Sequence, residues 1–244
     1  MGGRRMAVAG IGVGGSVRVC LTGPRGRRVI AGHNIATNYA LQGYAQWAMG
    51  VPNGPFATGA VVAPQYIAVG TWGGTCSTTD LFLFGEVARS RQAAQYSNLY
   101  QGTTAQLTAS WPPGAITGTI LEAGLFDAPI EGANVGTGGV AAGATTLPVA
   151  NGPPAVTGGS TPGRYETIWI DDGASSEYCA LAASADDLAT SWTLQTALQY
   201  GHAAGVVIQV FGPNLWAHAS IDATVDATDQ MSIQWSIPFT ATGQ

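Results

Sequence analysis

A strict two-residue alternation near the end of the chain most constrains its fold. From Met231 to Phe239, apolar residues occupy every second position and polar residues lie between them, apart from Pro238. This period is typical of a β-strand with one buried face. Similar runs at Ser16–Thr22, Gln65–Thr71 and Thr103–Trp111 are separated by turn-forming sequences such as Gly23-Pro24-Arg25-Gly26. The sequence therefore predicts a mainly β protein with antiparallel strands.

One segment has a helical pattern instead. Asn34 is a favourable N-cap residue, and the apolar residues after it recur at helical spacing. We therefore predict a helix from Ile35 to Met49, ended by Gly50 and Pro52. Together with the strands, this pattern predicts an antiparallel β-sandwich with one packed α-helix.

The stretch from Gly118 to Asp127 marks the point where a second domain is inserted. It is apolar except for Glu122 and its final Asp, and it reads as a buried strand. Gly- and Ala-rich sequence with weak strand signals follows, and a strong strand pattern returns at Leu215. We predict a discontinuous β-sandwich docking domain of residues 1–131 and 214–244, and an inserted β-barrel or β-roll module of residues 132–213 that projects outward. Glu122 is expected to pair with Arg89 or Arg91.

Charge is scarce and unevenly distributed. Charged residues make up 9% of the chain, against about 25% in an average protein. Six arginines and no acid precede Asp80, whereas the remainder holds three arginines and all 14 acids, and lysine is absent. Low charge favours a surface covered by neighbouring molecules, and the asymmetry favours contact between copies or with an acidic partner. Solvation of strand edges explains the arginines equally well.

The candidate interaction residues from this pattern are Arg18, Arg25, Arg27 and Arg28. These arginines are not interleaved with aromatic residues, so direct binding to nucleic acid is not expected. No uninterrupted apolar stretch reaches the length of a membrane span, and the Gly-rich start does not read as a signal peptide. Cys20, Cys76 and Cys179 lack CxxC spacing, which predicts neither a zinc site nor a disulfide framework and fits a reducing cytoplasm.

No motif predicts catalysis, a metal or a cofactor. Gly10 to Gly15 formally matches GxGxxG, but a strand pattern follows it and no acid lies at the required distance. The acids Asp171, Asp172, Asp186 and Asp187, with Glu166 and Glu177, are candidates for a calcium site or a glycosidase pair, although turn chemistry explains them as well. His33, His202 and His218 lack metal-ligand spacing and are expected to be structural. We therefore expect a protein that is not an enzyme.

Aromatic residues in the inserted module are candidates for a sugar-binding platform, although packing in a small barrel accounts for most of them. These residues are Trp169, Tyr178, Trp192, Tyr200 and Phe211.

The order of several segments resembles a family of tailed-bacteriophage virion accessory proteins. The family has an HNLxTxxG-type helix start, a YIAVGTG strand, a GAEVAR segment, a GTIxEAGLFDA strand and two final strands. The corresponding segments here are His33–Asn38, Tyr66–Thr71, Gly85–Arg89, Gly118–Ala128, Leu215–Ile221 and Met231–Phe239. The resemblance covers residues 16–131 and 214–244. Residues 132–213 are extra and more loosely resemble small β-modules of phage structural proteins.

The resemblance implies a structural role in a virus particle. Family members occur among tail, fibre and head-decoration proteins, so we expect a multi-copy protein that decorates the capsid or attaches to the tail. The implied partners are major capsid or tail proteins and other copies of the chain, and the implied location is the virion, assembled in the host cytoplasm. The alternative is a carbohydrate- or receptor-binding module of a tail or head fibre, with a host-surface glycan as its ligand.

Overall fold

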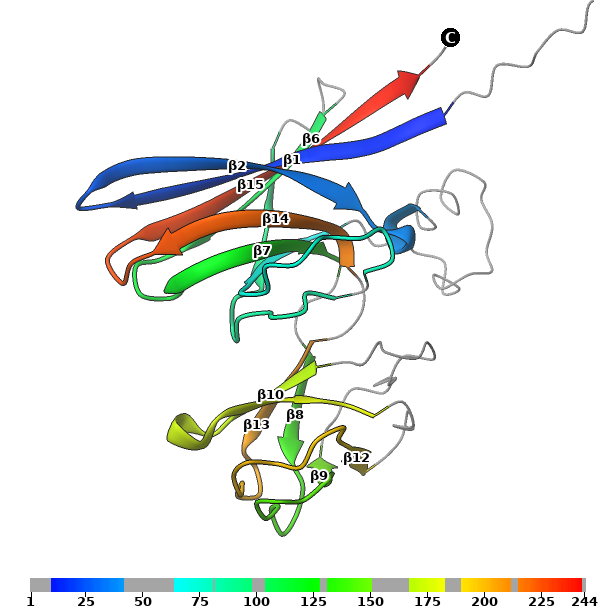
Figure 1. Cartoon of the computed structure of the whole chain (residues 1–244), viewed down its shortest axis with the longest axis vertical. Coiled ribbons are helices and arrows are strands. Elements are labelled where there is room, and N and C mark those ends of the chain that lie inside the picture. Colours follow the sequence, from blue (N-terminus) through cyan, green and yellow to red (C-terminus); the bar gives the residue numbers. More distant parts are fainter. Residues whose placement is uncertain are drawn as a thin grey trace, which may run out of the picture. The chain divides into compact units, whose positions relative to one another are not determined.

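The computed structural model of the chain describes residues 10–41, 64–80, 82–97, 104–127, 131–150, 167–182, 190–211 and 215–242 (Figure 1). The chain forms two compact units. Unit 1 comprises Met1–Pro129 and Asn214–Gln244, and unit 2 comprises Ile130–Pro213. The first border lies two residues before the expected one, and the second coincides with it.

Unit 1 contains one antiparallel sheet of nine strands, in the order β4-β3-β7-β14-β2-β1-β15-β6-β5. The first and last strands of this order are consecutive in the chain and are separated only by Ala94. The two edges of the sheet therefore belong to one bent segment, and the sheet is rolled into a nearly closed barrel. The strands are β1 (Gly10–Gly23), β2 (Gly26–Ala36), β3 (Tyr66–Gly70), β4 (Gln92–Ala93), β5 (Gln95–Ser97), β6 (Thr104–Trp111), β7 (Gly118–Phe126), β14 (Leu215–Val225) and β15 (Gln230–Thr242).

The predicted mainly β, antiparallel class is confirmed. In unit 1, the two packed layers are opposite walls of one rolled sheet. The alternating residues of β15 face the core as expected, and Ile233 and Trp235 are fully buried there. They pack in one cluster with Val19 of β1 and Leu107 of β6. Burying a side chain of this size stabilises the fold by about 1.5–3 kcal/mol.

Strand β7 is covered on both faces, which explains its nearly continuous apolar sequence. Ala123 and Leu125 face the main core. Phe126 and Gly124 lie on the opposite face. Phe126 packs there in a second cluster with Leu83. The second face therefore lies beneath the segment that connects β3 to β4.

The predicted helix cap at Asn34 is wrong. Strand β2 continues to Ala36 because Asn34 pairs with Gly15 on one side and Ala219 on the other. Helical structure begins at Asn38. Thr37 serves as the cap, since the Ala40 N–H donates to its Oγ1 at 3.4 Å. The described helix extends to residue 41, and the rest of the predicted helix lies outside the described residues.

Unit 2 is a half-barrel formed by a six-stranded antiparallel sheet, in the order β11-β10-β13-β8-β9-β12. Its core includes Ile168, Ile170, Leu147, Trp192 and Ile208. Strand β12 is short and ends at Thr193. The elements are β8 (Glu131–Val135), β9 (Thr146–Ala150), β10 (Thr167–Asp171), the 3-10 helix η1 (Gly173–Ser175), β11 (Glu177–Ala180), β12 (Ser191–Thr193) and β13 (Val207–Phe211).

Within the residues that the structure describes, no helix has the length and apolar character needed to cross a lipid bilayer.

Candidate functional site

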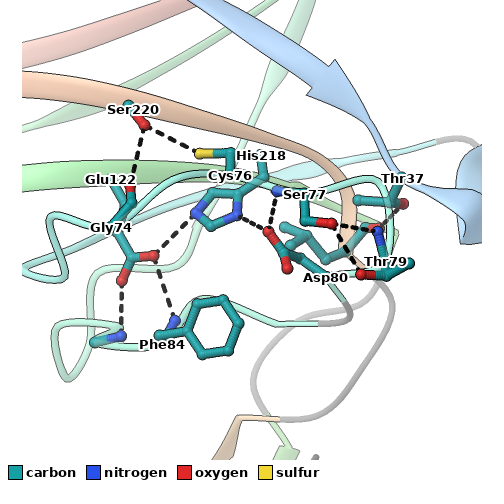
Figure 2. A network of polar contacts seen from close by, with 12 residues as sticks. Thr37, Gly74, Cys76, Ser77, Thr79, Asp80, Phe84, Glu122, His218 and Ser220 are labelled. Carbon is teal, nitrogen blue, oxygen red and sulfur yellow. Dashed lines mark hydrogen bonds and ion pairs between the residues drawn. The ribbon is translucent and has the colours of Figure 1, made fainter.

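A buried histidine bridges two carboxylates in unit 1 (Figure 2). His218 of β14 places Nδ1 2.7 Å from Asp80 Oδ2 and Nε2 2.9 Å from Glu122 Oε2. Glu122 comes from β7, and Asp80 comes from the segment between β3 and β4. The His218 side chain is fully buried, and the Asp80 and Glu122 side chains are 6% and 1% exposed. Three elements are therefore joined through one imidazole.

The arrangement holds the imidazole in its charged form. Two carboxylates can accept from both ring nitrogens only if both nitrogens carry hydrogen. Burial opposes the charge, but hydrogen bonds with Cys76, Glu122 and Asp80 outweigh it and raise the pKa of His218 to about 10. The centre is therefore an anion–cation–anion group at neutral pH.

Glu122 also fixes the segment between β3 and β4 through its backbone. The N–H groups of Gly85 and Phe84 donate to Oε1 at 2.7 Å and to Oε2 at 3.3 Å. A Cβ at Gly70 would overlap Glu122 Oε1 and lie 2.7 Å from the Gly85 carbonyl oxygen. Glycine at position 70 therefore lets the carboxylate reach this segment.

A second buried ion pair lies in the same segment. Arg91 Nη2 lies 2.8 Å from Glu86 Oε2, and the two side chains are 2% and 1% exposed. The Arg91 guanidinium also lies 3.7 Å from the centre of the Phe126 ring. Glu122 is thus a buried, paired acid as predicted, but its side-chain partner is a histidine, and Arg91 pairs with Glu86.

Aromatic rings enclose the His218 centre. Trp72 stacks with the imidazole at 6.2 Å between ring centres, and Phe84 lies at the same distance. Cys76 Sγ lies 3.2 Å from Ser220 Oγ nearby. To activate the Cys76 thiol or the Ser220 hydroxyl as a base, His218 would need an unprotonated ring nitrogen. Both of its ring nitrogens are instead hydrogen-bonded to carboxylates. The geometry is that of a structural clamp.

Unit 2 contains a centre of the same composition. His202 lies with Nδ1 3.0 Å from Asp172 Oδ2 and Nε2 2.9 Å from Glu177 Oε1. Glu177 also accepts hydrogen bonds from the backbone N–H groups of Gln199 and Tyr200, at 2.8 and 2.9 Å. Burial raises the pKa of Glu177, but these bonds and His202 outweigh it, so the pKa lies below its ordinary value. Each unit therefore uses a buried histidine to hold a loop to its sheet.

The four candidate arginines have different surroundings. Arg25 and Arg28 form ion pairs with Asp226 and Asp229 in the turn between β14 and β15. Arg27 Nε donates to Cys20 Sγ at 3.0 Å, and this bond lowers the pKa of the Cys20 thiol. Arg18 is exposed on β1. Two of the four arginines therefore join hairpin ends within unit 1.

The candidate aromatic residues also differ in their surroundings. Trp169 and Tyr178 face each other across β10 and β11, with ring centres 4.4 Å apart. Trp192 is 2% exposed and belongs to the core of unit 2. Tyr200 is half-buried and lies in the loop held by Glu177. The sequence grouped these residues, whereas the structure brings only Trp169 and Tyr178 together on an outer face.

The remaining candidate residues from the sequence lie in strands or structural contacts, or outside the described residues. Gly10 to Gly15 lies in β1 rather than before a helix. Asp172 belongs to the His202 centre, whereas Asp186, Asp187 and Glu166 lie outside the described residues. Among the described residues, no three His, Cys, Asp or Glu side chains are grouped so as to hold a metal ion.

The three cysteines are free thiols. Cys76 and Cys179 are buried, whereas Cys20 is half-buried.

The two histidine centres could not be found from the sequence. His218 lies 138 residues from Asp80 and 96 from Glu122. The only signal was Glu122, an acid in the interior of the apolar stretch 118–127, which suggested a buried partner without identifying it. Comparisons with protein-family models, curated proteins and solved structures found no significant match to this chain.

Proposed function

We propose that the chain is a non-enzymatic structural protein of a tailed-bacteriophage virion, present in many copies on the capsid or tail. The observation that carries this proposal is one wide, almost uncharged surface of unit 1. The resemblance of the ordered segments to phage virion proteins supplies the kind of assembly. The partners would be major capsid or tail proteins and other copies of the chain.

This surface is the outer face of four adjacent strands, β2, β1, β15 and β6. We call it the outer wall. Its members point away from the core. The residues between them are buried in β1, β15 and β6 and half-buried in β2. They are Ser16, Arg18, Cys20, Thr22, Arg27, Val29, Ala31, His33, Ile35, Gln106, Thr108, Ser110, Ser232, Gln234 and Ser236.

The composition of the outer wall favours burial against another protein. It contains no acid, its only permanent charges are Arg18 and Arg27, and Val29 and Ile35 are 45% and 37% exposed. Interface cores are depleted in charge in the same way. The face, rather than a sheet edge, would make the contact, because the edge strands β4 and β5 meet at Ala94.

The chemistry of the titratable groups supports a non-enzymatic role. His218 and His202 each bond two carboxylates, and Arg91 is buried against Glu86. These groups stabilise the two units instead of meeting a substrate.

The proposal can be tested with phage particles and purified protein. Quantitative mass spectrometry of purified virions should find the chain in many copies. Particles lacking it should bind the added wild-type protein, and Val29→Glu should weaken this binding at least about tenfold, since it places a charge in the contact. Val207→Glu, at a similarly exposed position of unit 2, is the matched control and should bind normally. Absence of the chain from virions, or equal binding by both variants, would overturn the proposal.

A further inference from the structure

We propose that the outer face of β11, β10, β13 and β8 in unit 2 is a binding site for a neutral pyranose glycan. Strand register places four residues in one row across this face. Tyr178 is opposite Trp169, Trp169 is opposite Gln209, and Gln209 is opposite Gly132. The row thus consists of an aromatic pair, then an amide side chain, and then a glycine.

The aromatic pair provides a surface for the apolar face of a sugar ring. Tyr178 is 48% exposed, Trp169 is half-buried, and their ring centres are 4.4 Å apart at 49°. The core of unit 2 does not need them there, because Ile168 and Ile170 face the core from the same strand. The C–H groups of a pyranose gain dispersion contacts on such rings, and its hydroxyls stay at the rim.

Hydrogen-bonding groups border the aromatic pair on the side where hydroxyls would lie. Gln209 is next to Trp169, and the neighbouring row contains Asp171, Val207 and Asn134. The Asn134 Nδ2 group donates to the Gly205 carbonyl oxygen at 3.1 Å, so the amide and carboxylate oxygens of this row are the groups that would accept from sugar hydroxyls. Val207 is 49% exposed and adds an apolar contact. Polar groups around an apolar platform are the combination that an amphipathic sugar needs.

Gly132 leaves room for the ligand at the end of the row. A Cβ added there would meet nothing within 4 Å. Gly132 therefore leaves a shallow space beside Gln209, where a second sugar unit can lie against the strand. Glycine is less favourable than alanine in a strand, and packing does not require it here.

The charges of unit 2 select neutral sugars. Residues 130–213 contain seven acids and one arginine, and Asp171 lies on the proposed face itself. An acidic sugar would meet repulsion from this excess of negative charge. The site is therefore expected to bind hexose polymers and to reject sialylated or uronic-acid glycans.

Affinity electrophoresis of the full chain in native gels tests the proposal. The probes are soluble β-glucan, dextran, galactomannan and arabinogalactan, with polygalacturonate as the acidic probe. At least one neutral polysaccharide should retard the wild-type chain. Tyr178→Ser and Trp169→Leu should lower the association constant at least about tenfold, and Trp169→Phe should keep part of it.

Gly132→Gln keeps the proposal falsifiable if the aromatic variants fold poorly. A Cβ at this position meets nothing within 4 Å, so the variant should fold normally, and its longer side chain should block binding. Val29→Ser, at an exposed apolar position of unit 1, is the control and should bind like the wild type. No retardation by any neutral probe, binding to polygalacturonate alone, or unchanged binding by Gly132→Gln and Tyr178→Ser would each overturn the proposal. None of these results depends on whether the chain is found in a virion.

Discussion

His218 Nε2 lies 2.9 Å from Glu122 Oε2, although the two residues are 96 positions apart in the chain. Strand pairing sets this contact. His218 is opposite Gly124, and Glu122 is two residues further along β7 on the same face. Gly124 has no side chain, and Leu215, Phe126 and Leu83 fill the space above it. The pair joins adjacent strands of unit 1, and Asp80 adds the segment between β3 and β4 to the same centre.

Replacing His218 should strongly destabilise unit 1. His218→Gln would leave Asp80 and Glu122 buried without their shared cation, which costs about 3–5 kcal/mol for a broken buried pair. Chemical denaturation, with hydrogen exchange to read each unit separately, measures the change. His33→Gln, on the exposed outer wall, should change the stability by less than about 0.5 kcal/mol. Equal effects of the two substitutions would contradict the clamp.

The stability that His218 contributes should depend on pH. Its pKa is about 10 in the folded chain against 6.5 ordinarily, so folding takes up a proton at this ring between those values. The contribution is complete below pH 6.5 and is lost as the pH rises to about 10. The stability difference between wild type and His218→Gln should therefore shrink by up to about 1.4 kcal/mol per pH unit. A difference that stayed constant up to pH 10 would contradict the charged state.

Removing one partner of the Arg91–Glu86 pair should cost more than removing both. Arg91→Met leaves Glu86 buried alone, and the expected loss is about 3–5 kcal/mol. Burial already raises the pKa of Glu86 in spite of Arg91. The double variant Arg91→Met, Glu86→Gln should recover part of the loss, because no charge stays buried. A double-mutant cycle in denaturant measures the coupling, and simple additivity would argue against a buried ion pair.

A side chain at Gly70 should displace the Glu122 carboxylate. Gly70→Ala is expected to destabilise unit 1 by about 1–3 kcal/mol, since the added Cβ would overlap Glu122 Oε1. Gly132→Ala is the matched strand control, because its Cβ would meet nothing, and it should be neutral or slightly stabilising. Thermal unfolding of both variants provides the comparison. A neutral Gly70→Ala would show that Glu122 does not need this position empty.

The stabilisation that Glu177 gives unit 2 should be lost at acidic pH. The pKa of Glu177 is below its ordinary 4.5 in the folded chain, so its stabilisation is present above about that pH and is lost as the pH falls through the folded value. Glu177→Gln should cost about 1–3 kcal/mol at neutral pH and little in acid. Gln199→Ala should leave unit 2 unchanged, because only the backbone N–H of Gln199 contacts Glu177. An acid-independent effect of Glu177→Gln would contradict this assignment.

The helix start shows where local sequence was insufficient. Asn34 and Thr37 are both acceptable caps, and an apolar stripe follows either one. Asn34 is taken into β2 because strands on both sides pair with it. Those partners lie elsewhere in the chain, so propensity could not choose between the two caps.

The aromatic residues of unit 2 show the same division. Trp169 and Trp192 both occur in short strand-like runs, and sequence alone grouped them. Trp192 turns into the core, while Trp169 faces outward opposite Tyr178. Which face of a short strand is buried depends on the sheet that covers it.

The sequence by itself determined the antiparallel β class, most of the strands and the place where unit 2 interrupts unit 1. Those properties depend on period-two alternation and turn residues, which act over a few positions. Only the tertiary structure decided which buried charges meet. The fold brings Asp80, Glu122 and His218 to one point, and because water is excluded there, the charge of His218 is balanced by the two carboxylates.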